Sequence, residues 1–239
     1  MIGLGTIINT AAILVGGLLG GLFGRYLSES TQETLTKCCG VSTLLIAVAG
    51  TMVGMLTIEN GQIESTGAML VIISLAVGAI IGELLNIEGA FERFGRWLKV
   101  KSGNAKDKQF VNAFVTASLT VCIGAMAIVG SIQDGLEGDY STLATKAVLD
   151  LIIIMVMSSS LGKGAVFSAI PVAVFQGSIT ALAGLLRPLM TDAALANLSL
   201  VGNVLIFCVG INLVWGKKVK VANLLPAIVV AVAAAFLPV

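Results

Sequence analysis

The chain has 239 residues, of which 57% are hydrophobic and only 11% are charged. A soluble globular protein carries about 25% charged residues to keep its surface wet, so a chain of this composition needs lipid as its solvent. The net charge of +1 provides no global field for binding nucleic acid. We therefore predict an integral membrane protein whose general partner is membrane lipid.

The sequence lacks the usual motifs of enzymes and metal sites. It has no histidine, and its four cysteines form no CxxC pair, so we expect neither a zinc site nor a disulfide framework. Without histidine there is no HExxH motif and no Ser/His pair, and no glycine loop follows a strand to hold phosphate. We expect a protein that is not an enzyme and has no cofactor.

Several apolar stretches are long enough to cross a bilayer, since a ~30 Å hydrocarbon core needs roughly 20 helical residues. They cover about residues 2–24, 37–57, 67–87, 111–132, 143–161, 164–186, 198–216 and 221–238. Only Gly-Lys-Gly separates the fifth stretch from the sixth, so seven spans with a broken or re-entrant hairpin there is the alternative. The predicted fold is an all-α polytopic transmembrane helix bundle forming a single membrane domain, residues 1–239.

Basic residues alternate between the predicted connections. One set of connections holds Arg25, Lys37, Arg93, Arg96, Lys99, Lys101, Lys106, Lys108, Lys163, Lys217, Lys218 and Lys220. The opposite set holds Arg187 alone, and Lys146 lies within a span. Because positive residues stay on the cytoplasmic side, this distribution predicts eight crossings with both termini outside.

The longest predicted cytoplasmic connection covers residues 88–110. Phe91, Phe94 and Trp97 recur in it at helical spacing beside Arg93 and Arg96. This pattern is typical of an amphipathic helix lying in the headgroup layer. We expect an interfacial connector, with lipid sensing or partner docking as the alternative.

The first predicted span carries a stripe of small residues. Gly16, Gly20 and Gly24 share one face, with Gly17 and Gly21 beside them. In lipid, small residues let helix backbones approach closely. We expect this stripe to pack helices together, either inside the protein or across a homodimer.

Two stretches, residues 45–61 and 120–135, are weakly similar to each other. Each leaves the membrane on the predicted outer side and precedes another apolar span, and internal duplication is common in transporters. An internal duplication and a chance similarity both stay open. The matched pairs are Gly50/Gly124, Met52/Met126, Ile58/Ile132, Asn60/Asp134 and Gly61/Gly135.

The fifth predicted span holds two charged residues, Lys146 and Asp150, one turn apart on the same face. A charge at the bilayer centre costs at least ~2.5–3.5 kcal/mol. We expect the long side chain of Lys146 to reach the headgroups. An aspartate cannot reach that far, so we expect Asp150 to have a functional role, with a structural ion pair to Lys146 as the alternative.

A polar and irregular segment follows in residues 158–177. Glycine and proline there free backbone groups that lipid cannot satisfy, and broken helices at membrane depth point to transporter binding sites. The alternative is a cytoplasmic turn at residues 162–164 followed by a simple proline kink. The residues concerned are Ser158, Ser159, Ser160, Gly162, Gly164, Ser168, Pro171 and Gln176.

Three features carry a family resemblance: the glycine-rich first span, the motif GAMAIVGSIQDG and the segment DLIIIMVMSSSLGKGAVFSAIPVAVFQGSITALAG. They resemble the YqgA/YdfK-type family of bacterial inner-membrane proteins over nearly the whole chain. The resemblance implies a multi-span protein of a bacterial cell membrane and a proposed transporter, but no substrate and no residue roles. The matching positions are Gly124, Gly130, Asp134, Gly135, Asp150, Ser160, Gly162, Gly164, Ser168, Pro171 and Gln176.

One deep acid, an irregular polar helix pair and little mass outside the membrane predict a small secondary transporter or channel. In this hypothesis Asp150 carries a proton or a monovalent cation, the serines and Gln176 line the path, and Asn9 or Asn203 completes a site. A divalent cation is disfavoured because it needs several oxygen ligands, including carboxylates. The alternative is a non-transporting scaffold or sensor that acts through residues 88–110.

Overall fold

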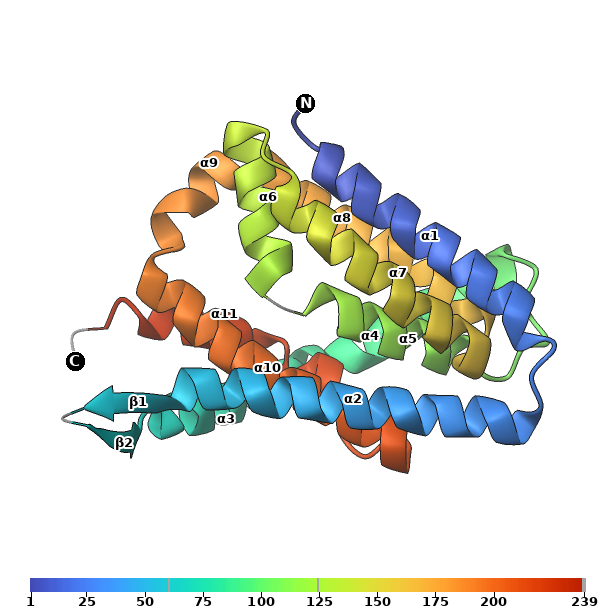
Figure 1. Cartoon of the computed structure of the whole chain (residues 1–239), viewed down its shortest axis with the longest axis horizontal. Coiled ribbons are helices and arrows are strands. Elements are labelled where there is room, and N and C mark those ends of the chain that lie inside the picture. The colour runs from blue at the N-terminus through green and yellow to red at the C-terminus, as the bar shows by residue number, and fades with distance from the viewer. Residues whose placement is uncertain (60, 124, 238–239) are drawn as a thin grey trace. The chain divides into compact units, whose positions relative to one another are not determined.

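A computed structural model describes residues 1–59, 61–123 and 125–237 (Figure 1). Helices dominate the described residues, and a short antiparallel hairpin is the exception. The elements are α1 (Leu4–Gly24), α2 (Glu29–Met55), β1 (Leu56–Glu59), β2 (Gln62–Ser65), α3 (Ala68–Leu85), α4 (Ile87–Lys101), α5 (Phe110–Cys122), α6 (Ala125–Glu137), α7 (Ser141–Leu161), η1 (Lys163–Ser168), α8 (Ala169–Ala181), α9 (Ala183–Leu186), η2 (Arg187–Leu189), α10 (Asp192–Trp215), η3 (Val221–Leu224) and α11 (Pro226–Ala234).

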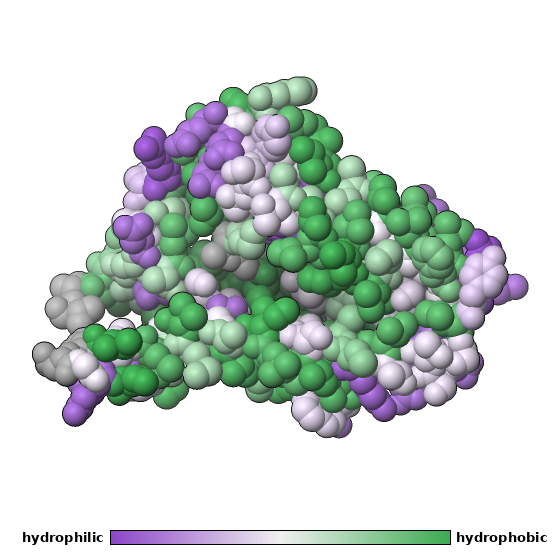
Figure 2. All heavy atoms as spheres, viewed as in Figure 1, coloured by the Kyte–Doolittle hydropathy of each residue, from purple (hydrophilic) through white to green (hydrophobic). Residues whose placement is uncertain are grey.

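The predicted all-α membrane architecture is confirmed. Within the described residues, 6 helices are long and apolar enough to cross a membrane, or up to 7 if the bent pair α5–α6 counts as one span. The last predicted span corresponds to a shorter apolar stretch, Val221–Ala234. Hydrophobic residues are exposed along α1 and along the part of α2 from Val41 to Val53, as lipid contact requires (Figure 2).

Two predicted segments differ from the structure. Residues 56–65, predicted as the end of the second span and the connection that follows it, form the β1–β2 hairpin, in which Leu56 pairs with Ser65 and Ile58 with Ile63. The predicted span 111–132 is divided into α5 and α6, which are bent by 62°. The backbone of Ile123 is extended, so the helical hydrogen bonds of α5 stop there, and a hydropathy average does not register such a break.

The stretches matched as an internal duplication agree in part of their local structure. Met52 and Met126 both lie in helices, α2 and α6, whereas Ile58 lies in β1 and Ile132 in α6. Residues 60 and 124 lie outside the described residues, and the duplication stays a prediction.

The chain divides into two compact units. The first unit comprises Met1–Cys39 and Gly89–Arg187, and the second comprises Gly40–Glu88 and Pro188–Val239. In the first unit α1 packs against α7 and α8, and α6 packs against α7 and α8. In the second unit α3 and α10 both pack against α11.

Each unit contains a similar helical hairpin. α7 ends at Gly162 (φ 104°) and α10 ends at Gly216 (φ 75°), both in a region that favours glycine. A 3₁₀ turn, η1 or η3, then leads into α8 or α11. Proline lies near the start of each second helix, at Pro171 and Pro226, where a missing N–H costs no helical hydrogen bond. Pro171 lies within the candidate span Lys163–Ala181, close to the change from the 3₁₀ turn η1 to α8, and a simple proline kink there stays an alternative.

The amphipathic connector forms α4, which covers the first part of residues 88–110. Gly95 and Leu98 are buried, and Gly95 faces Phe114 of α5. On the other side of α4, Trp97 is 54% exposed and stacks on Phe94. One face of α4 thus packs on α5, where Phe94 also meets the ring of Phe114 edge-on, while Trp97 stays half exposed.

Candidate functional site

A buried ion pair lies within α7 in the first unit. The Lys146 ammonium donates to Asp150 Oδ2 at 2.5 Å, and the two side chains are 8% and 4% exposed. The prediction that Lys146 reaches the headgroups is wrong. A carboxylate one turn away supplies a nearer partner, because residues four apart on a helix lie side by side.

Three close contacts set the register of the helices around this pair. A Cβ added to Gly5 of α1 would lie 2.7 Å from Leu143 of α7 and 3.2 Å from Asp134 of α6. One added to Gly135 of α6 would lie 2.4 Å from the carbonyl of Thr180 in α8. We infer from this register that one turn further into the unit, at 3.6 residues per turn, α1, α7 and α8 each carry a buried polar residue. This polar layer consists of Asn9, Lys146 and Gln176.

The polar layer contains side chains that lack partners in the described part of the chain. None of the amide nitrogens and oxygens of Asn9 and Gln176 makes a hydrogen bond. Asn9 approaches the Asp150 carboxyl group without reaching hydrogen-bond geometry. A buried amide without a partner costs about 1–3 kcal/mol on mutational scales. The layer therefore retains the capacity to bind further polar groups.

Further polar atoms are buried in the first unit. The hydroxyls of Thr6, Ser118 and Thr180 are buried without a hydrogen-bond partner among the described residues. The Cys122 thiol, at the end of α5, lies within electrostatic range of both Lys146 and Asp150. Asn9 of α1 and Cys122 of α5 thus lie near the pair from two helices.

Asp134 is a second deep carboxylate that the sequence analysis did not single out as a site. It is fully buried, and it accepts the backbone N–H groups of Gly3 and Gly5 at 3.2 and 3.0 Å. A carboxylate at this position stabilises the positive end of the α1 dipole. The signal available in the sequence was the motif SIQDG, but the predicted span ended at residue 132, which placed Asp134 outside the membrane.

The predicted path serines bond to backbone carbonyls. Ser158 donates to Gly17 of α1 at 2.8 Å and so links α7 to α1. The hydroxyls of Ser159 and Ser160 both bond to Val156, and that of Ser168 bonds to Ala165. Such bonds to the preceding turn are ordinary for serines in helices.

Glycine stripes bring helix backbones together in the first unit. Added Cβ atoms on Gly16, Gly20 and Gly24 would lie 2.3, 2.0 and 2.7 Å from the carbonyl oxygens of Leu151, Met155 and Ser159. Both residue numbers rise together, so α1 and α7 run parallel. Gly17 faces Val166 of η1, whereas a Cβ on Gly21 would meet only Ser158 Oγ at 3.6 Å.

Two other predicted site residues have separate places. Gly164 lies against the backbone of Phe110, where a Cβ would come within 2.0 Å of the carbonyl oxygen. Asn203 belongs to α10 of the second unit and packs against Gly50 of α2. The structure thus brings Asn9, Asp150 and Gln176 together in the first unit, whereas Asn203 is a residue of the second.

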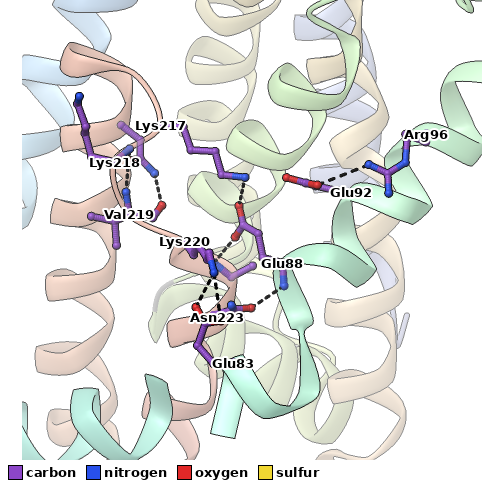
Figure 3. A network of polar contacts seen from close by, with 11 residues as sticks. Glu83, Glu88, Glu92, Arg96, Lys217, Lys218, Val219, Lys220 and Asn223 are labelled. Atoms are coloured by element: carbon purple, nitrogen blue, oxygen red, sulfur yellow. Dashed lines mark hydrogen bonds and ion pairs between the residues drawn. The ribbon is translucent and has the colours of Figure 1, made fainter. Parts of the chain in front are cut away.

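A charged network lies at the ends of α3 and α10 in the second unit (Figure 3). Lys220 bonds both carboxylate oxygens of Glu83 at 3.0 and 3.1 Å. The Glu88 carboxylate pairs with Lys217 at 2.8 Å and accepts the Ala222 N–H at 3.1 Å. Asn223 Oδ1 accepts the Glu88 N–H at 2.7 Å. This network closes the turn around η3.

Comparisons with known proteins identify the family. The family described as protein of unknown function DUF554 matches residues 4–236. The uncharacterized membrane protein YdfK of Bacillus subtilis (strain 168) is 30% identical over 95% of this chain and 93% of its own length. The uncharacterized protein YqgA of Escherichia coli (strain K12) is 27% identical over 95% of this chain and 94% of its own length. No solved structure matches. The resemblance found in the sequence is therefore confirmed, and this helical membrane protein belongs to the DUF554 family.

Proposed function

We propose that this protein is a small secondary transporter or channel of a bacterial inner membrane, multi-pass, in which Asp150 couples a proton to the movement of a small solute or monovalent ion. The observation that carries the proposal is the Lys146–Asp150 pair, buried in helices that have the length and composition of membrane spans. Ionisable groups at such positions mark ion pathways and proton relays far more often than packing.

The pair provides two charge states. With Asp150 ionised, it compensates Lys146 at 2.5 Å. A proton on Asp150 removes that compensation and leaves a buried cation, which is costly in a medium of low dielectric constant. Helix arrangements that suit one charge state therefore do not suit the other, and this difference is what couples a proton to a conformational change. The lysine partner favours a proton over a metal cation as the species that Asp150 carries, because the ammonium already occupies the carboxylate.

The test is proton flux in proteoliposomes that contain a pH-sensitive dye. Gradients of sodium, potassium, chloride, nitrate and formate salts are imposed in turn, and we expect at least one to drive proton movement by the wild type. Asp150→Asn should reduce this flux to the level of protein-free vesicles. Undiminished flux in that variant would remove Asp150 from the mechanism.

Asp139→Asn is a matched control. Asp139 lies in the connection between α6 and α7, and the Ser141 N–H that it accepts at 2.9 Å lowers the pKa of its carboxyl group. Asparagine can accept the same bond at a helix N-terminus. This variant should therefore keep wild-type flux although it also loses one carboxylate.

The competing function is a scaffold or sensor that acts through α4. Trp97 and Val100 are 54% and 67% exposed on this helix, next to Arg93 and Arg96, as in helices that lie on anionic membrane surfaces. It predicts that Trp97→Ala with Arg93→Ala abolishes function while Asp150→Asn does not. Because a non-transporting scaffold gives no proton flux even in the wild type, the flux assay separates the two functions, and a pull-down with residues 88–110 tests for the partner that the scaffold requires.

A further inference from the structure

The ammonium group of Lys146 has unused hydrogen-bonding capacity. It can donate three hydrogen bonds, and in the described part of the chain it makes one, to Asp150 Oδ2. Lys146 is the sole cation among the described buried residues. Whatever else binds at this level therefore meets one buried positive charge.

Two buried amides add donors near this level of the first unit. Asn9 and Gln176 each offer an NH₂ group without a partner among the described residues, and they are 0% and 1% exposed. Asn9 lies near the Asp150 carboxyl group, and Gln176 lies on α8, which packs against α1. Neutral amide donors beside a buried ammonium form an environment that suits an anion.

We propose that the polar layer is a binding site for a small monovalent anion that is taken up together with one proton. This inference rests on the proposed function, because it uses Asp150 as the proton-carrying group. The proton binds the Asp150 carboxylate and breaks its bond to Lys146, and the anion takes the place of the carboxylate at the ammonium. The site is neutral before the exchange, as Asp⁻ with Lys⁺, and neutral after it, as AspH with Lys⁺ and the anion.

The charge balance limits the ligand to a single negative charge. Lys146 can compensate one, and the fully buried Asp134 carboxylate, held by Gly3 and Gly5, adds negative potential near the helix ends. The packing limits the size, because Ile13, Leu143 and Val172 are completely buried in the same helices. Formate, nitrate and chloride fit these limits.

The titratable neighbours are few. Lys146 faces Asp150 on its own helix, and Cys122 faces it from α5. α1 packs against α7 and carries the neutral Asn9, and α8 packs against α1 and carries the neutral Gln176. η1 also packs against α7, and its one charged residue, Lys163, is exposed. Asp134 of α6 lies toward the helix ends and bonds α1. Protonation that depends on an added anion can therefore be assigned to Asp150 by a single substitution.

Anion affinity can be measured on the full chain in detergent by thermal shift between pH 5 and pH 8. Formate, nitrate and chloride are each titrated at constant sodium and constant ionic strength, with gluconate as the balancing anion. Because one proton enters with each anion, the apparent affinity of the wild type should fall about tenfold per pH unit on the alkaline side. Asp150→Asn should bind the same anion with no dependence on pH, since its side chain is always neutral.

The double variant Lys146→Met/Asp150→Asn carries no charge at this position and should show no anion-dependent shift at any pH. It is preferred to Lys146→Met alone, which leaves a buried carboxylate without a partner and is expected to fold poorly. Lys146→Arg, which keeps the positive charge beside Asp150, should bind the anion as the wild type does. Anion binding that survives in the double variant, or that is independent of pH in the wild type, would overturn the inference.

The vesicle assay separates this inference from the proposed function. If proton flux is present but is driven equally by all sodium salts, and no anion shifts the unfolding temperature, the anion site is wrong and the proton-coupled transporter stands. If anions bind with the expected pH dependence but no gradient drives proton flux, the binding site stands and transport is wrong.

Discussion

The two units place their charges differently. In the first, the Lys146–Asp150 pair is almost fully buried inside α7, a helix with the length and composition of a span. In the second, the partners in the Glu83–Lys220 pair are both more than half exposed, and Lys217 is 47% exposed beside the buried Glu88. A pair such as Glu83–Lys220 keeps most of its hydration and serves to close a turn. A pair taken out of water is costly and is kept where a charge is used.

Among substitutions that test this difference between the units, Lys146→Met should lower the free energy of unfolding most, because it leaves the Asp150 carboxylate buried and unpaired. We expect a loss of about 3–5 kcal/mol in the free energy of unfolding, measured by denaturant titration in mild detergent. Lys146→Met/Asp150→Leu removes both charges and should be close to the wild type. Equal instability of the single and double variants would show that the pair matters through its packing and not its charge.

Gly20→Val should have the second-largest effect, because its side chain would overlap the Met155 carbonyl. We expect a loss of about 3 kcal/mol in the free energy of unfolding, or failure to fold. Gly21→Ala, one residue along, should be tolerated, since its Cβ would lie 3.6 Å from Ser158 Oγ. Gly82→Ala tests the same kind of close backbone contact in the second unit, where a Cβ would meet the Asn223 carbonyl. Thermal unfolding of the three variants would show whether both units depend equally on backbone contact.

Asp134→Ala should destabilise the first unit by about 2 kcal/mol, because the N–H groups of Gly3 and Gly5 lose a charged acceptor. Asp134→Asn keeps one acceptor oxygen and should cost less. Hydrogen exchange of the α1 amides is the sensitive measurement. If exchange at the start of α1 is unchanged in Asp134→Ala, the carboxylate does not hold that helix end.

Lys220→Ala should have the smallest effect, since its partner Glu83 is exposed and solvent screens the pair. We expect an unfolding temperature close to that of the wild type, with a difference that shrinks as salt is added. A large loss of stability that salt does not reduce would contradict the contrast between deep and peripheral pairs.

The sequence predicted the parts of the fold that hydropathy controls. Stretches such as residues 143–161 correspond closely to α7, because their length and apolar content leave few other structures in lipid. Local backbone conformation was harder to predict from the sequence. The extended Ile123 that ends α5 and the β1–β2 hairpin both depend on dihedral angles that an average over a window does not resolve.

For the candidate site, the residue types in the sequence indicated which side chains matter, but not which partners they bind. Asp150 and Lys146 were visible as charges in an apolar run, but burial and a nearby carboxylate decided where the lysine points. Asn9 and Gln176 come from helices far apart in the chain, so their common level in the first unit depends on the glycine contacts that set the register. The bonds of Ser158–Ser160 and Ser168 to backbone carbonyls likewise depend on local geometry.

The parallel course of α1 and α7 constrains how the intervening chain is threaded. If both helices traverse the bilayer in the same sense, the chain that leaves Gly24 must return to the starting leaflet before Ser141, which requires an odd number of passages. If α2 and α3 each cross once, they supply two, and the α5–α6 pair, despite its 62° bend, then supplies a third as a single passage. A re-entrant loop in its place would leave an even number of passages between α1 and α7. The two helices would then run antiparallel, and the α7 carbonyls could not lie against the glycines of α1 in the observed order.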